Sequence, residues 1–173
     1  MKKTFLTLSA AALILLAACN NEKKENTETP APTTETPAPA PTTGNVSAGV
    51  AEVTLNAGDD MKYDINEIKV KEGQTVKVTL HHTGKAPVTA MGHNFVLLEE
   101  GVDLAEFAAA AIKAKDNDYI PKDKTGDVIA HTKTIGGGET TQVEFKAPPK
   151  GTYEYLCSFP GHSALMKGKF IVE

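Results

Sequence analysis

The eight residues 75–82 read Thr-Val-Lys-Val-Thr-Leu-His-His and alternate between apolar and polar side chains. Successive side chains of a β-strand point to opposite faces, so every second residue of this stretch shares one face. The set on one face is Val76, Val78, Leu80 and His82. This period of two predicts a strand with one buried face.

The same alternation recurs on both sides of this stretch, in short runs separated by turns that contain glycine. These runs are 53–55, 68–70, 96–98, 143–145, 153–157 and 170–172. Many short strands separated by turns are typical of a β-sandwich or a barrel. We therefore expect an all-β domain over residues 49–173, a length that suits a single hydrophobic core.

One segment, 103–115, departs from the period of two. Its apolar residues recur at helical spacing, and they are Leu104, Phe107, Ala108, Ala111 and Ile112. Asp103, followed three residues later by Glu106, forms a variant of the capping box. The pattern predicts one amphipathic helix near 103–115, inserted in the β fold, and a polar loop over 116–127.

The first 18 residues have the features of a secretory signal peptide. Lys2 and Lys3 precede an apolar run, 5–16, that is too short for a stable membrane span. The ending Leu-Ala-Ala-Cys at 16–19 resembles a bacterial lipobox, which implies that Cys19 becomes the lipidated first residue of the mature protein. The alternative is ordinary secretory cleavage, which would leave a free Cys19.

Residues 19–48 differ sharply in composition from the rest, because prolines alternate there with alanine, threonine and glutamate. Such a stretch cannot bury enough apolar surface to offset the entropy of ordering, which predicts a disordered tether. About 30 residues of this kind reach at most about 90 Å. A passive linker without a preferred length is the alternative. Asn20, rather than aspartate, after Cys19 resembles outer-membrane more than inner-membrane sorting.

Charge excludes one class of function. The chain has a formal net charge of −4, no arginine and no basic cluster in the domain, so nucleic-acid binding is not expected. Once Cys19 is lipidated, Cys157 is left without a cysteine partner in a compartment that permits disulfides. Metal ligation explains such a lone cysteine, and the alternative is a buried, inert thiol.

Residues 157–166 read Cys-Ser-Phe-Pro-Gly-His-Ser-Ala-Leu-Met and combine a thiolate, an imidazole and a thioether. Two sulfur ligands and an imidazole suit copper. A trigonal copper site needs a second imidazole, and His93 in Met-Gly-His-Asn, 91–94, is the best candidate. Gly92 permits close approach of the backbone, so its carbonyl oxygen is a candidate weak ligand. His82 is expected to be packed and hydrogen-bonded, His131 partly exposed, and His81 solvent-facing.

Together, 91–94 and 157–168 resemble the azurins of the cupredoxin family, and the similarity covers essentially all of 50–173. The resemblance implies a cupredoxin-like Greek-key β-sandwich of about eight strands. It implies that His93, Cys157 and His162 are strong equatorial ligands, with Met166 as a long axial thioether and the Gly92 carbonyl oxygen opposite to it. In the second shell, Asn94 would tie the two ligand loops together, and the Phe159 amide would donate to the Cys157 sulfur. With the lipobox and the tether, the whole chain resembles lipid-modified azurin.

This resemblance implies a type 1 (blue) copper protein with one copper ion, which transfers single electrons in the periplasm from a lipid anchor. Partners would be c-type cytochromes, nitrite reductase or peroxidase, and the protein would be a monomer. They would dock on an apolar rim around His162, consisting of Met61, Met91, Pro160, Ala164 and Leu165. An enzyme is not expected, because all strong ligands are protein groups. The alternatives are a copper-handling lipoprotein without redox turnover and, more weakly, a structural zinc site, for which methionine is a poor ligand.

The chain differs from many azurins in two respects. It has no cysteine pair for the usual disulfide, a bridge that typically contributes about 2–4 kcal/mol to stability. It also has no tryptophan, and Phe95 stands where the best-known azurins carry that residue. Core packing is expected to differ there, without the loss of a ligand.

Overall fold

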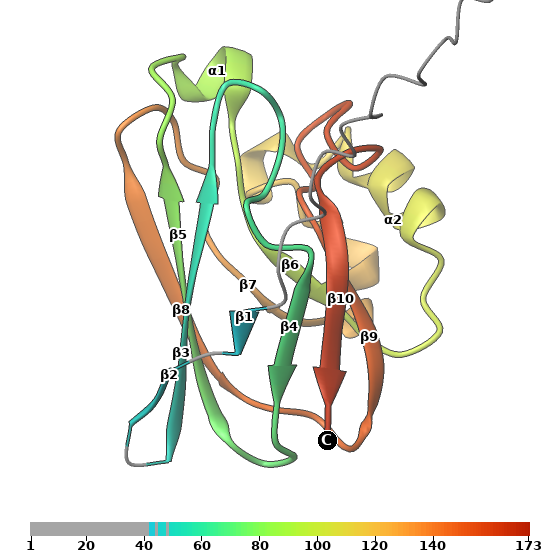
Figure 1. Ribbon diagram of the computed structural model, residues 1–173. Coiled ribbons are helices and arrows are strands. Elements are labelled where there is room, and N and C mark those ends of the chain that lie inside the picture. Colours follow the sequence, from blue (N-terminus) through green and yellow to red (C-terminus); the bar gives the residue numbers. More distant parts are fainter. Residues whose placement is uncertain (1–41, 44, 48) are drawn as a thin grey trace, which may run out of the picture. The chain divides into compact units, whose positions relative to one another are not determined.

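The computed structural model describes residues 42–43, 45–47 and 49–173, which fold into two packed β-sheets (Figure 1). The larger sheet contains, in spatial order, β1 (Thr42–Thr43), β4 (Glu67–Val70), β10 (Lys167–Val172), β9 (Gly151–Leu156), β6 (Val96–Leu98) and β7 (Val128–His131). The smaller sheet contains β2 (Asn45–Ser47), β3 (Val50–Ala57), β5 (Thr75–His82) and β8 (Thr140–Lys146). The eight strands β3 to β10 confirm the predicted all-β fold.

Strand β5 is the inner strand that the alternation of 75–82 predicted. It pairs in parallel with β3 and antiparallel with β8. Val76, Val78, Leu80 and His82 are all fully buried, which confirms the predicted face.

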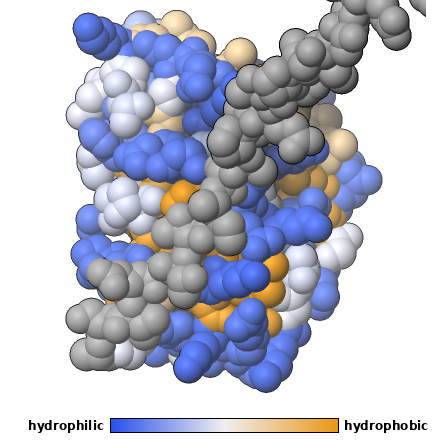
Figure 2. All heavy atoms as spheres, in the orientation of Figure 1, coloured by the Kyte–Doolittle hydropathy of each residue, from blue (hydrophilic) through white to orange (hydrophobic). Residues whose placement is uncertain are grey.

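Hydrophilic residues cover much of the face seen in Figure 2, with hydrophobic residues showing between them.

Strand β6 and the last two residues of strand β9 are buried on both faces, because two separate core clusters flank the larger sheet there. Phe95, Leu97 and Tyr155 belong to the cluster between the two sheets. Val96 and Leu156 belong to a second cluster. The short helix α2 (Leu104–Ala111) covers this second cluster and buries its Phe107 there.

Helix α2 ends earlier than the sequence predicted. The Asp103 side chain caps its start by accepting from the amides of Ala105 and Glu106, both at 2.9 Å. Ile112, expected on the buried face, lies past the last helical residue and is 55% exposed. The chain tightens there into η1 (Lys115–Asn117), a 3-10 helix, and η2 (Lys122–Asp127) follows inside the predicted loop. This turn brings residues 118–120 back against the sandwich, which a longer helix would prevent.

Residues 42–47 belong to the segment for which composition predicted disorder. In the structure, β1 pairs in parallel with β4, and β2 pairs antiparallel with β3. Edge pairing requires only backbone donors and acceptors, which are independent of side-chain hydrophobicity. These pairings involve five residues at the end of the predicted tether. The predicted signal peptide 1–18, Cys19, residues 20–41, Gly44 and Ala48 lie outside the described residues, so the tether stays a prediction.

Three connections meet at one end of the sandwich (Figure 1). They are 58–66 between β3 and β4, 83–95 between β5 and β6, and 157–166 between β9 and β10. The second of these contains the short helix α1 (Val88–Met91). In the described part of the chain, no helix is both long and apolar enough to cross a membrane.

Candidate metal centre

Three buried side chains from two of these connections converge at this end of the sandwich. The potential ligand atoms of His93, Cys157 and His162 all lie within 4.8 Å of one another. The Cys157 Sγ atom lies 3.7 Å from the Nδ1 atom of His162 and 3.8 Å from the carbonyl oxygen of Gly92. The structure thus brings together the three residues that the sequence predicted as strong ligands, with the predicted weak ligand beside the thiol.

The hydrogen bonding of His93 leaves one ring nitrogen free for a metal. Its Nε2 atom lies 2.9 Å from the carbonyl oxygen of Gly58, which can only accept, so Nε2 carries the proton. The buried Nδ1 atom has no hydrogen-bond partner among the described residues. Buried polar atoms are normally paired, and a lone pair directed into a cluster of a thiol and an imidazole fits a metal ion.

Burial sets the protonation of the three groups. It is the main reason why the pKa of His162 is lowered to about 4, and the neighbouring His93 and His82 add to the shift. Burial likewise lowers the pKa of His93. It raises the pKa of Cys157 to about 11, opposed by hydrogen bonds from the backbone amides of Asn94 and Phe159. Without metal, the imidazoles are therefore neutral at pH 7 and the thiol is protonated.

The connection 157–166 is closed by its own backbone hydrogen bonds. The amide of Cys157 donates to the carbonyl of Met166 at 2.9 Å, and the amide of Met166 donates to the carbonyl of His162 at 2.8 Å. Gly161 has a φ of 84°, the left-handed region in which glycine has no steric penalty. The spacing of cysteine, histidine and methionine in the sequence therefore corresponds to one compact turn that directs His162 towards Cys157.

Asn94 joins the two ligand loops. Its Oδ1 atom accepts from the Ser158 amide at 2.9 Å, and its Nδ2 atom donates to the Ser158 hydroxyl at 2.9 Å. The same Nδ2 atom donates to the carbonyl of Asp118 at 2.8 Å. Asn94 and Ser158 directly follow His93 and Cys157, so these bonds couple the positions of two predicted ligands.

Three residues that sequence reasoning did not assign to the site also support His93. The ring of His82 stacks on the ring of His93. Gly58 fixes its tautomer, as described above. The Tyr63 hydroxyl donates to the carbonyl of Asn94 at 2.5 Å. The burial of His82 could be predicted from alternation, whereas no local pattern pairs residues 58 and 63 with residues 93 and 94.

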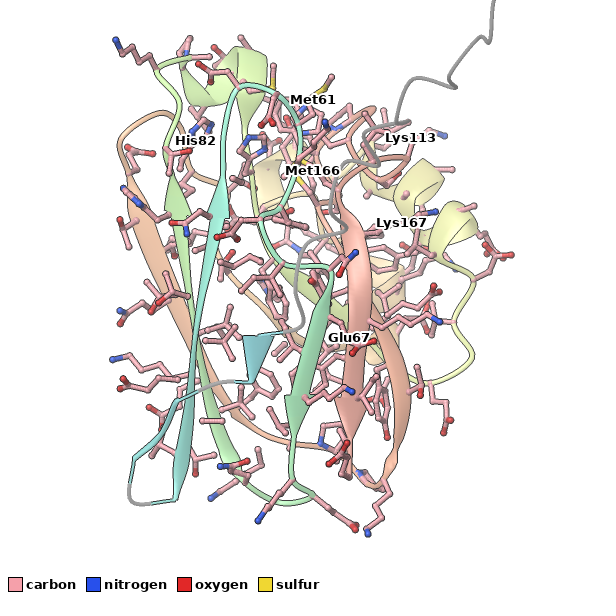
Figure 3. The ribbon with its side chains drawn as sticks, viewed as in Figure 1. Met61, Glu67, His82, Lys113, Met166 and Lys167 are labelled. Carbon is pink, nitrogen blue, oxygen red and sulfur yellow. The ribbon has the colours of Figure 1, made fainter. Side chains whose placement is uncertain are left out.

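The remaining predicted residues lie around this cluster. Met166 is fully buried in the same core cluster as Cys157 and Phe159, and Figure 3 shows Met61, His82 and Met166 at this end of the sandwich. The predicted rim is accessible to different degrees: Leu165 and Ala164 are exposed, whereas Met61, Met91 and Pro160 are half-buried. His131 is exposed and His81 is half-buried.

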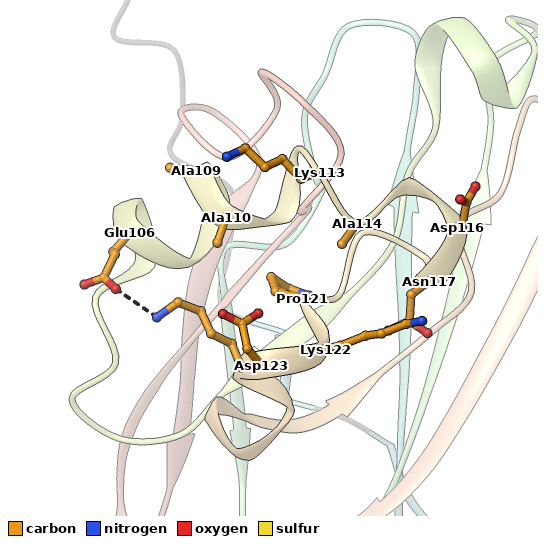
Figure 4. Close-up of a pocket in the computed structure, with 11 residues that line it drawn as sticks. Glu106, Ala109, Ala110, Lys113, Ala114, Asp116, Asn117, Pro121, Lys122 and Asp123 are labelled. Carbon is orange, nitrogen blue, oxygen red and sulfur yellow. Dashed lines mark hydrogen bonds and ion pairs between the residues drawn. The ribbon is translucent and has the colours of Figure 1, made fainter.

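A separate surface hollow of about 720 Å³ lies between α2 and the 3-10 helices, away from the cluster (Figure 4). Charged side chains line it, including Lys113, Asp116 and Asp123, over a floor of alanines. The Glu106–Lys124 ion pair lies at its edge, at 2.8 Å. It contains none of the buried donors of the metal cluster, so we assign the chemistry of this protein to the cluster.

Comparisons with known proteins agree with this geometry. The model of the family "Copper binding proteins, plastocyanin/azurin family" matches residues 50–173. The chain is 45% identical to azurin of Achromobacter denitrificans over 71% of this chain and 85% of that protein. It is 37% identical to outer membrane protein H.8 of Neisseria gonorrhoeae over 96% of this chain and 97% of that protein.

A solved structure supports the same conclusion. Auracyanin A, a "blue" copper protein of Chloroflexus aurantiacus, superposes with a TM-score of 0.66 at 34% identity, over 72% of this chain and all of that one. Its likeness confirms the cupredoxin fold, and the donors His93, Cys157 and His162 are compatible with one copper ion. The chain therefore belongs to the plastocyanin/azurin family of copper-binding proteins.

Proposed function

We propose that this domain is a type 1 (blue) copper protein that carries single electrons. The main support is the buried Nδ1 atom of His93, which has no hydrogen-bond partner among the described residues, in a ring whose ligand atom lies within 4.8 Å of a thiol and of a second, neutral imidazole. In this assignment His93, Cys157 and His162 would be the strong ligands that hold the ion. Met166 would supply a weak thioether ligand, and the carbonyl oxygen of Gly92 would supply a further weak ligand.

The surroundings of these residues suit electron transfer. A bound copper ion supplies the one-electron change between Cu(I) and Cu(II). The protein's contribution is a ligand set that moves little between the two states. Asn94 and Ser158 couple the two ligand loops, Gly58 fixes the ring of His93, and 157–166 is closed by internal hydrogen bonds. All strong ligands are protein groups, so no position is left open for a substrate, which supports a carrier rather than an enzyme.

Electrons would enter and leave through His162, which is 4% exposed at the surface of the end loops. The segment 157–166 has no charged residue, and Leu165 in it is 60% exposed. Leu165 forms an apolar rim together with Met61, Met91, Pro160 and Ala164, and such a rim suits weak, short-lived docking. By family analogy the partners are redox proteins such as c-type cytochromes, nitrite reductase or peroxidase, and the carrier acts as a monomer.

We further propose that the domain is exported and held at the outer membrane by a lipid on Cys19, with the stretch after Cys19 as a tether and 49–173 as the copper domain. The lipobox-like ending at 16–19 supports this, as does the similarity to a Neisseria outer membrane protein that spans 96% of the chain. Cys19→Ala in full-length protein expressed in a bacterial host should move the protein from the membrane to the soluble fraction. Retention of the variant on membranes would contradict the anchor.

Addition of Cu(II) to the purified metal-free domain tests the carrier function. We expect an intense blue colour at one equivalent of copper, which bleaches on reduction and returns on reoxidation. Cys157→Ser should abolish the colour, because the thiolate is its source, whereas His131→Gln, an exposed histidine, should leave it unchanged. A colourless copper complex would favour the alternative function, copper handling without redox turnover. Preference for zinc over copper would favour a structural site.

A further inference from the structure

Two adjacent residues outside the ligand loops have an unusual backbone. Asp118 and Tyr119 both have left-handed φ angles, of 50° and 59°. Aspartate tolerates this region, but a bulky aromatic residue rarely adopts it. Such conformations persist only where surrounding contacts hold them, and they cluster at functional sites. The contacts of this pair therefore indicate what the conformation achieves.

Asp118 connects the two ligand loops to a third segment. Its carbonyl oxygen accepts from the Asn94 side chain at 2.8 Å and from the Thr134 hydroxyl at 3.3 Å. Its Oδ1 atom accepts from the Thr134 amide at 2.8 Å. Asn94 is the residue that bonds to Ser158, so Asp118 holds the amide group that couples the neighbours of His93 and Cys157.

Tyr119 reaches the same loops by packing. Its ring meets the ring of Phe159 edge-on, with centroids 5.1 Å apart. Phe159 in turn packs on the ring of His162 at 4.7 Å. Tyr119 is buried, with only 8% of its surface exposed. The two residues thus act on different targets: Asp118 on Asn94, and Tyr119, through Phe159, on His162.

The pair is itself anchored to the layer beneath α2. The amide of Tyr119 donates to the carbonyl of Ala114 at 3.0 Å. The Asn117 side chain donates to the carbonyl of Ile120 at 2.7 Å. Ile120 is buried in the cluster that contains Phe107 of α2. Because α2 ends early, this turn can connect the helix layer to the metal centre.

We propose that Asp118 and Tyr119 are positioning residues, which clamp Asn94 and Phe159 and thereby hold the ligand loops in one arrangement. The expected effect of the clamp on bound copper rests on the proposed copper function. The clamp itself is formed by contacts within the chain and is measurable without metal. Among the described residues, neither has a hydrogen bond or a ring contact with a predicted ligand, so their effect on the ligands passes through Asn94, Phe159 and Thr134.

The experiment uses the metal-free domain first. In Asp118→Ala, which loses the Oδ1 acceptor and the tolerance for positive φ, hydrogen exchange of the Ser158 amide should be about tenfold faster. Ser158 is the informative amide, because it bonds to Asn94 and not to Asp118. Asp118→Asn keeps the acceptor and the backbone preference, so it should restore slow exchange. Asp118→Gly, which tolerates the backbone angle but lacks the acceptor, keeps the test available if the alanine variant does not fold.

The second measurement loads the same variants with Cu(II). Asp118→Ala and Tyr119→Ala should change the ratio of the two main thiolate-to-copper absorption bands and the copper hyperfine splitting, and they should release copper to a chelator about tenfold faster. Asp116→Asn, in exposed η1, controls for loss of one negative charge and should match the wild type.

Two outcomes would contradict the proposal that Asp118 and Tyr119 act as a clamp. One is unchanged Ser158 exchange in Asp118→Ala and Asp118→Gly despite lower global stability. The other is a copper spectrum and release rate identical to the wild type in every variant. If the wild type itself binds copper without colour, the proposed carrier function fails, and Ser158 exchange still decides whether the clamp exists.

Discussion

The imidazole rings of His82 and His93 stack with their centroids 4.3 Å apart and their planes at 21°. His82 is fixed at both nitrogens, since Nε2 lies 2.8 Å from the Met91 carbonyl and Nδ1 accepts from the Gly84 amide at 3.1 Å. A ring held at both edges is a rigid surface for its neighbour. His82 therefore orients a predicted copper ligand without binding the metal itself.

His82→Ala should lower the free energy of unfolding of the metal-free domain by about 2–4 kcal/mol, because it leaves a cavity and removes the partners of two half-buried backbone groups. Urea unfolding measures this change. Exposed His131→Ala is the control and should change stability by less than about 0.5 kcal/mol. An equal loss of unfolding free energy in both variants would show that the stacking does not contribute to stability.

Gly92→Ala should destabilise the site through lack of space. The backbone of Gly92, with φ −74° and ψ 141°, is open to any residue. An added Cβ would lie 2.6 Å from the Phe159 ring and 2.8 Å from the Thr134 methyl. Overpacking of this kind costs about 1–3 kcal/mol, and displacement of Phe159 should also perturb the copper absorption spectrum.

Gly126→Ala is the matched control for this substitution, because no described atom beyond its own turn and chain neighbours lies within 4 Å of its Cβ position. Urea unfolding and the absorption spectrum of the copper-loaded protein compare the two variants. A Gly92→Ala protein as stable as Gly126→Ala, with an unchanged spectrum, would contradict the steric account.

Acid should destabilise the metal-free domain through its buried histidines. His162 has a folded pKa of about 4, against about 6.5 in an unfolded chain, so the unfolded state binds more protons between these values. The contribution of His162 to stability should therefore be constant above about pH 6.5 and fall as pH decreases towards 4. His93, whose pKa is also lowered, acts in the same direction.

Unfolding free energies measured in urea from pH 4 to pH 8 test this dependence. His162→Gln should reduce the slope by up to one proton, that is, by a factor of up to about ten in the unfolding constant per pH unit. His131→Gln should keep the slope of the wild type. An unaltered slope in His162→Gln would contradict a buried, neutral His162.

Copper binding should release one proton at neutral pH. The thiol of Cys157, with a pKa of about 11, must ionise to bind a metal, whereas His93 and His162 are already neutral. An indicator dye in weakly buffered solution at pH 7.5 should report one proton per Cu(II) bound, and Cys157→Ser should release none. Release of two or three protons would mean that the imidazoles are charged in the metal-free protein.

The sequence alone determined the features that depend on short-range order. Strand periodicity placed β5 and its buried face, and the spacing within 157–166 identified Cys157 and His162 as candidate ligands, because residues of one turn are held together by the chain itself. The start of α2 could likewise be predicted from the sequence, since Asp103 caps amides only two and three residues away.

Only the tertiary structure decided the contacts that join distant segments. Alternation predicted that His82 is buried, but the stacking on His93 depends on how β5 and the strand that follows His93 are packed. The end of α2 at Ala111 follows from the return of Asp118 to Asn94 and of Tyr119 to Phe159, which helix propensity does not encode. Such contacts arise when two sheets and a helix layer pack together, and side chains far apart in sequence then compete for the same space and the same hydrogen bonds.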